Sequence, residues 1–98
     1  MQEIKETSMP LPDEIVDYLQ ALDYEAGGLR VLHTHALNAG VPTGRVEEIR
    51  QRFLDKYAEY QAAKQEVWGR YGSGRPCPWW VDFQSGRLCM REEAGNDA

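Results

Sequence analysis

The chain has 98 residues and a formal net charge of −5, which is enough sequence for one domain with a small hydrophobic core. The overall acidity opposes binding to phosphate backbones, so we do not expect a nucleic-acid partner. The polar stretch 1–8 does not resemble a signal peptide, and no stretch approaches the ~20 apolar residues of a membrane span. We therefore expect a cytoplasmic protein without a membrane partner.

Residues 1–11 are mostly polar and are expected to form a flexible N-terminus. Residues 12–72 then show two helical patterns, in which seam positions recur every three or four residues as on one face of an α-helix. In the first pattern these positions are Ile15, Leu19, Leu22, Ala26, Leu29, His33 and Ala36. In the second pattern they are Val46, Ile49, Phe53, Tyr57, Tyr60, Lys64, Val67 and Tyr71.

The break between the two patterns has the residues of a tight helix–helix connection. Gly40 suits a left-handed C-cap, Pro42 cannot continue a helix, and Thr43 suits the N-cap of the second helix. A connection this short makes the two helices antiparallel neighbours. Residues whose numbers add up to about 82 then meet across the seam, as Leu29 does with Phe53.

The charge is distributed unevenly along the chain. Residues 1–42 carry two basic residues against seven acidic ones, whereas residues 43–91 carry nine basic residues against six acidic ones. An acidic helix paired with a basic one is complementary within the hairpin itself. We prefer this interpretation to a nucleic-acid surface.

Two consecutive glycines, Gly27 and Gly28, lie in the middle of the first helix. Each weakens a helix by about 1 kcal/mol relative to alanine. Two interpretations remain open. The pair is either a tolerated soft spot with a small kink, or a place between Tyr24 and Val31 where another chain approaches the helix backbone closely.

The histidines and cysteines do not indicate a metal site or a cofactor. His33 and His35 lie about 200° apart on a helix and cannot chelate one ion, and the chain lacks a Cys-x-x-Cys motif. The expected strand register holds Cys77 and Cys89 too far apart for a disulfide. A different turn, or a chain that curls back between them, would allow one.

After the helices, the Gly- and Pro-rich residues 73–78 predict a linker. Residues 79–91 predict a β-hairpin around a two-residue turn, Ser85-Gly86. That turn pairs Phe83 with Leu88. The acidic residues 92–98 are expected to be a disordered tail.

The predicted hairpin has one apolar and one mixed face. Val81, Met90 and Trp79 share the apolar face, and Trp80 lies opposite Arg91 within cation–π reach on the other. A lone hairpin is marginal in water, so it is expected to pack on the helices or on another chain. The predicted fold class is mainly α (α+β): a long antiparallel two-helix hairpin followed by a short C-terminal β-hairpin.

No catalytic motif is present: there is no nucleotide-binding loop, nucleophile elbow or metalloprotease helix. Small size, a long helical platform and a Trp-rich hairpin instead favour a non-enzymatic interaction module, an adaptor or assembly protein that binds a partner protein or itself as a homo-oligomer. Aromatic and Arg side chains carry much of the energy of such interfaces. The candidate partner-binding residues are Tyr24, Gly28, Val31, Leu32, Leu37, Leu54, Trp79, Trp80, Arg87 and Arg91.

An alternative function is a small acidic regulator or inhibitor that occludes a basic site on a larger complex. The acidic residues of the first helix, Asp13, Asp17, Asp23 and Glu25, would carry that binding. Salt separates the two hypotheses, because charge-driven occlusion weakens steeply with ionic strength and apolar docking does not.

Overall fold

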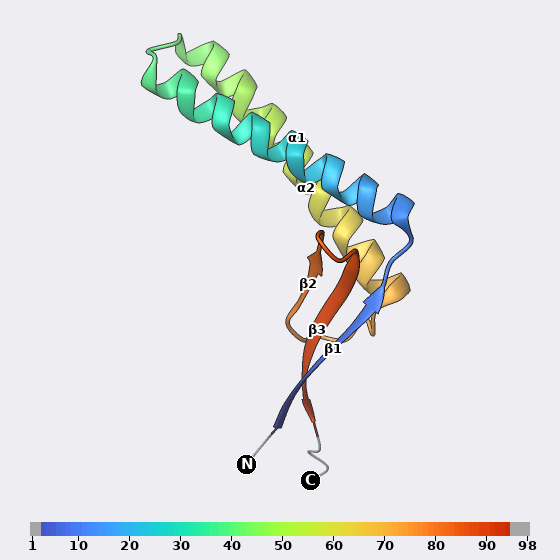
Figure 1. The fold of residues 1–98 in the computed structure, drawn as a ribbon. Helices are drawn as coiled ribbons and strands as arrows, with labels where there is room; N and C mark the ends of the chain where they lie inside the picture. The colour runs from blue at the N-terminus through green and yellow to red at the C-terminus, as the bar shows by residue number, and fades with distance from the viewer. Residues whose placement is uncertain (1–2, 95–98) are drawn as a thin grey trace. The chain divides into compact units, whose positions relative to one another are not determined.

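The structure, a computed structural model, describes residues 3–94 and contains two long helices and a small antiparallel sheet (Figure 1). The elements follow in the order β1 (Glu3–Pro10), α1 (Asp13–Asn38), α2 (Thr43–Tyr71), β2 (Trp79–Asp82) and β3 (Arg87–Ala94). The predicted class, mainly α with a small β part, is confirmed. The chain forms two compact units: the hairpin unit, Asp17–Gln65, and the sheet unit, within Met1–Val16 and Glu66–Ala98.

The connection between the helices is a glycine-capped turn, as predicted. Gly40 has a φ of 71°. Its N–H donates to the carbonyl of Leu37 at 3.4 Å, and the N–H of Val41 donates to the carbonyl of Ala36 at 3.2 Å. This is the Schellman arrangement, which satisfies the last carbonyls of α1. The carbonyl of Pro42 accepts the first bonds of α2, so Pro42 rather than Thr43 takes the N-cap position.

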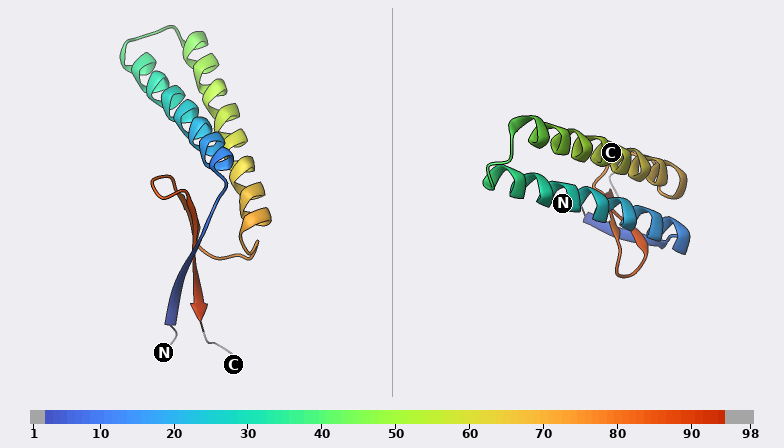
Figure 2. Two further views of the ribbon diagram at one scale, coloured as in Figure 1. Left: turned by 45° about the vertical axis from the view of Figure 1, so that its right-hand side comes forward. Right: turned by 90° about the horizontal axis from the view of Figure 1, so that it is seen from above.

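Within the hairpin unit, α1 and α2 lie side by side along the predicted seam (Figure 2). The buried seam residues of this unit are Leu19, Leu22, Ala26, Ala36, Val46 and Tyr60. Lys56 and Glu25 form an ion pair of 3.0 Å between the helices, one residue from the predicted pairing. Tyr57 departs from the prediction, since 46% of it is exposed. An α-helix rotates by about 100° per residue, and this rotation places Tyr57 at the edge of the seam.

The paired glycines do not interrupt α1, which is continuous from Asp13 to Asn38. A methyl group added at Gly27 or at Gly28 would meet nothing within 4 Å. No close contact among the described residues 3–94 therefore requires glycine at either position.

The expectation of a flexible N-terminus over residues 1–11 is wrong for the described part of that segment. Glu3–Pro10 form β1, which pairs with β3 along its whole length, so the sheet order is β1-β3-β2. β2 is shorter than β3 and leaves the far end of β3 to β1 alone. In that end, Lys5 and Glu6 of β1 are polar and exposed. β3 also extends to Ala94, so the expectation of a disordered tail over 92–98 is wrong for residues 92–94, and residues 95–98 lie outside the described part.

The predicted β-hairpin forms, but with a longer turn. Val81 pairs with Leu88, so Phe83 leaves the strand and residues 83–86 make the loop. The loop is closed by the N–H of Gly86, which donates to the carbonyl of Asp82 at 2.8 Å. The register differs from the prediction by two residues. Because side chains alternate with a period of two, an even shift keeps residues 79–82 and 87–91 on their predicted faces, but Trp80 lies opposite Cys89 and not opposite Arg91 as predicted.

The core of the sheet unit forms where the ends of both helices meet one face of the sheet. Leu88 is fully buried, and Trp68 stacks on Trp79 with ring centroids 5.2 Å apart and planes within 2°. The indole N–H of Trp68 donates to the carbonyl of Arg75 at 3.2 Å. Leu11 is buried as well, and its N–H donates to the carbonyl of Gly86 at 2.9 Å.

Candidate protein-interaction surfaces

The hairpin unit exposes large apolar side chains, because a pair of helices gives each helix only one neighbour. The exposed residues that the sequence had assigned to a partner are Tyr24, Val31, Leu32, Leu37 and Leu54. Tyr24 is 69% exposed and Leu37 57%. Single exposed apolar residues are common on any protein surface, so their grouping matters more than their presence.

Three of the predicted partner-binding residues come together in one groove between the helices, here called the α1–α2 groove. Its volume is about 450 Å³, and it is lined by Tyr24, Glu25, Gly28, Leu29, Leu32, Arg52 and Lys56. Leu29 belongs to the seam and is half-buried. Val31, Leu37 and Leu54 do not line the groove.

The α1–α2 groove has an acidic residue on one wall and basic residues on the other. On α2, Lys56 contacts Glu25 at 3.0 Å and Glu59 at 3.1 Å. Hydrogen bonds to Glu25 and then Glu59 raise the pKa of Lys56 above its ordinary value, so its ammonium stays charged. Arg52 stands beside it on the same wall, and no ion pair or hydrogen bond joins the Arg52 side chain to another residue of the described segment 3–94. The groove therefore offers an apolar floor with charges of both signs at its rim.

A smaller hollow of about 100 Å³ lies on the other flank of the seam and is lined by Asp23, Ala26, Gly27, Arg30, Phe53, Tyr57 and Tyr60. Phe53 and Tyr57 make a tilted ring pair with centroids 5.8 Å apart. Burial raises the pKa of the Tyr60 phenol, and the Asp23 carboxylate raises it further. The sequence did not predict the exposure of Tyr57, because the same three- or four-residue spacing fits a residue in the seam and a residue at the edge of the seam.

In the sheet unit, the predicted cluster of Trp79, Trp80, Arg87 and Arg91 is divided between two faces. Trp79 is half-buried in its stack with Trp68 on the covered face. Trp80, Arg87 and Arg91 lie on the other face, as alternation along β2 and β3 requires.

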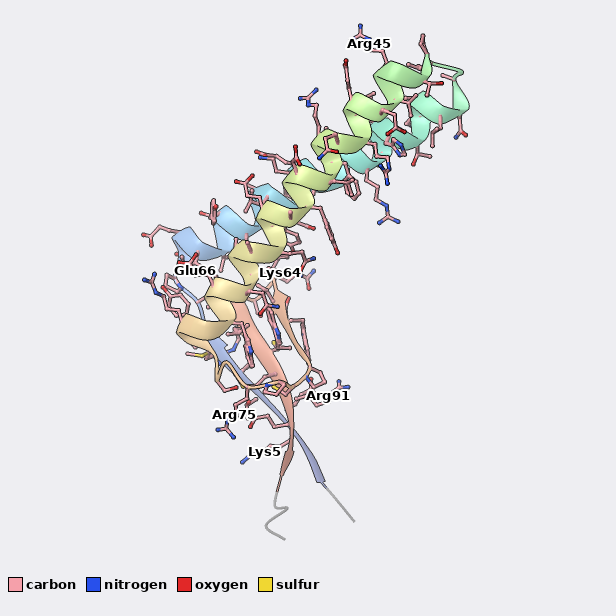
Figure 3. All side chains as sticks on the ribbon, turned by 180° about the vertical axis from the view of Figure 1, so that it is seen from behind. Lys5, Arg45, Lys64, Glu66, Arg75 and Arg91 are labelled. Carbon is pink, nitrogen blue, oxygen red and sulfur yellow. The ribbon has the colours of Figure 1, made fainter. Side chains whose placement is uncertain are left out.

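The open face of the sheet holds two different arginine environments. Arg91, which Figure 3 shows at the sheet, is exposed, and its guanidinium carbon lies 5.6 Å from the centroid of the Trp80 ring. Its ion pair with Glu6 is loose, at 3.9 Å. Arg87 instead donates to the side chain and the carbonyl of Ser8, at 2.9 and 3.1 Å, and so joins β3 to β1. Arg87 is thus used within the sheet, while Trp80 and Arg91 remain accessible.

The two cysteines lie in the sheet unit and are not bonded to each other. Cys77 and Cys89 are free thiols. Burial raises the pKa of the Cys89 thiol, with smaller contributions from Asp82 and Glu6, so the thiol is protonated at neutral pH and is a poor nucleophile. Within the part of the chain that the structure describes, no group of three or more His, Cys, Asp or Glu residues could hold a metal ion.

No family model, curated protein or solved structure matches this chain. Among residues 3–94, neither helix combines the length and the apolar character that crossing a membrane requires. The surfaces described above are therefore the basis on which a function can be argued.

Proposed function

We propose that this chain is a small non-enzymatic protein-interaction module, an adaptor or assembly protein, whose hairpin unit docks on a helical partner through the α1–α2 groove. The observation that carries the proposal is the grouping of exposed Tyr24 and Leu32 beside half-buried Leu29 in one groove. Grooves between helices bind the apolar face of another helix through residues spaced in this way. Arg52 and Lys56 at the rim supply charges that set the orientation of a partner.

The alternative, an acidic regulator acting through α1, receives less support from the same residues. Glu25 is neutralised by Lys56 at 3.0 Å, and Asp23 is half-buried beside the smaller hollow. Asp13 and Asp17 are exposed and keep the acidic interpretation open at the start of α1. An apolar interface with a charged rim is therefore the better account of the hairpin unit.

A photo-crosslinking amino acid in place of Leu32, compared with the same amino acid in place of Ala58, tests the proposal. Ala58 is also exposed on the hairpin unit, but it lines neither the α1–α2 groove nor the smaller hollow. In the cells that make the protein, we expect Leu32 to yield a discrete adduct with a polypeptide and Ala58 to yield none. Absence of any adduct at Leu32, or equal labelling at both positions, would contradict the proposed function.

The dependence of the crosslinking yield on salt concentration separates the two functions. Exposed charges are screened over ~3 Å at 1 M salt, whereas apolar burial is not weakened. We expect the Leu32 adduct to form with undiminished yield at high ionic strength. A steep loss of yield would favour the acidic regulator, as would loss on reversing Asp17 and Asp23 to lysine.

A further inference from the structure

We infer that the partner in the α1–α2 groove is the same groove of a second copy of this chain, so that two hairpin units form an antiparallel four-helix bundle. This inference rests on the proposed function and names its partner. Three properties of the hairpin unit support it: its thin core, the pattern of charge along the groove, and the area that its face can bury.

The hairpin unit buries only the line of residues between its two helices. Leu29 and Ile49 lie in that seam and are still only half-buried. Helices of a stable bundle normally bury a wider stripe, against two neighbours rather than one. A second hairpin unit laid over the groove would cover Leu29 and Leu32 from the open side.

The charges at the rim of the groove in one copy are complementary to those at the rim of the groove in a second copy. A twofold axis parallel to the helices places α1 of one copy across from α2 of the other, and every helix then has antiparallel neighbours. In that arrangement Glu25 of one copy faces the wall that carries Arg52 and Lys56 in its partner. Lys56 already contacts Glu25 of its own chain, so Arg52 is the basic residue of the groove that is left to pair with Glu25 of the other copy.

The size of the face fits a stable dimer. Residues 17–38 of α1 are roughly 33 Å long at about 1.5 Å per residue, and two helices side by side are roughly 20 Å wide. The face therefore measures on the order of 700 Å², close to the about 800 Å² that each partner of a standard interface buries.

Two pairs of matched variants test the inference by size-exclusion chromatography with light scattering on the full chain. Leu32→Asp places a charge in the groove, and Val31→Asp makes the same change at the next residue, which is exposed outside the groove. Arg52→Glu reverses a charge at the rim. Arg50→Glu makes the same reversal on the other flank of α2, where Arg50 contacts Glu47 at 3.8 Å.

We expect the unmodified chain at micromolar concentration to have twice the 11.2 kDa mass of one chain. Leu32→Asp and Arg52→Glu should each weaken the dimer roughly tenfold or more, while Val31→Asp and Arg50→Glu should leave it unchanged. All four sites are exposed, and circular dichroism should show that each variant keeps the helix content of the unmodified chain.

An unmodified chain that is monomeric at these concentrations overturns the inference. So does a dimer that a groove variant and its matched control variant weaken to the same extent. Neither outcome refutes the proposed function. That function stands if crosslinking from Leu32 still captures a discrete polypeptide of a different mass. A crosslinked adduct of two copies of this chain supports both.

Discussion

Two glycines near the end of α2 should respond to alanine in opposite directions. Gly69 lies within the helix, and a methyl group there would meet nothing within 4 Å, so Gly69→Ala should stabilise the fold by about 1 kcal/mol. Gly72 follows the last residue of α2, and its methyl group would overlap the indole ring of Trp68 and lie 2.9 Å from the Trp68 carbonyl oxygen. The ring cannot move away cheaply, because Trp79 stacks on it and Arg75 accepts its N–H.

Overpacking of this kind costs about 1–3 kcal/mol, so the two alanine variants should differ by roughly 2–4 kcal/mol in free energy of unfolding. Urea unfolding followed by circular dichroism measures that difference. All samples need the same protein concentration, because self-association would make the apparent stability depend on concentration. Tryptophan fluorescence should change for Gly72→Ala and not for Gly69→Ala. A Gly72→Ala protein with the midpoint and the emission of the unmodified chain would show that Trp68 is not held as described.

Three further predictions concern other parts of the chain. Gly27→Ala should raise the free energy of unfolding by about 1 kcal/mol, since α1 passes through this residue unbroken and the added methyl group has open space; an unchanged urea midpoint would contradict this. Hydrogen bonds from Ser85 and then from the Gln84 N–H lower the pKa of Asp82, so its contribution to stability is complete above about pH 4 and is lost as the pH falls through the lowered pKa. Asp82→Asn should therefore reduce the acid sensitivity measured by urea unfolding between neutral pH and about pH 3. Because burial raises the pKa of the Cys89 thiol, alkylation at this residue near neutral pH should be slower in the folded chain than in the urea-unfolded chain. Peptide mass spectrometry measures both rates, and equal rates would refute that account.

The helical hairpin could be predicted because its signals are local and repeated. Each seam position is set by its neighbours three and four residues away, and the turn needs only Gly40 and Pro42 in sequence. Errors at one position, such as Tyr57, do not disturb the rest of the pattern. The antiparallel pairing then follows from the short connection alone.

The N-terminal strand could not be predicted in the same way. β1 pairs with a strand at the other end of the chain, and the Arg87–Ser8 hydrogen bonds join residues 79 positions apart. Its residues 5–8 are all polar and exposed, so the alternation that marks a half-buried strand is absent there. The sequence pattern of such a polar segment predicts coil, and only its partner strand shows that it is a β-strand.

The candidate site was only partly accessible to sequence reasoning. A helical wheel identifies Tyr24, Val31 and Leu32 as lying off the seam, and all three are exposed. Which of them share a groove depends on how the second helix crosses the first, and only Tyr24 and Leu32 line one together. The neighbouring tryptophans were likewise assigned to opposite faces correctly, and Trp68 stacks on Trp79, on the face that the sequence predicts to be apolar.

The exposed apolar residues of the hairpin unit are not required by the fold of a single chain. Substitutions at exposed positions such as Val31 and Leu32 usually change stability by no more than about 0.5 kcal/mol. The buried seam residues, among them Leu19 and Leu22, supply the packing that holds α1 against α2. The proposed binding and the fold therefore depend on different residues of the same helices. Polar substitutions in the α1–α2 groove should remove an interaction without unfolding the hairpin, and this separation makes the groove a direct test of function.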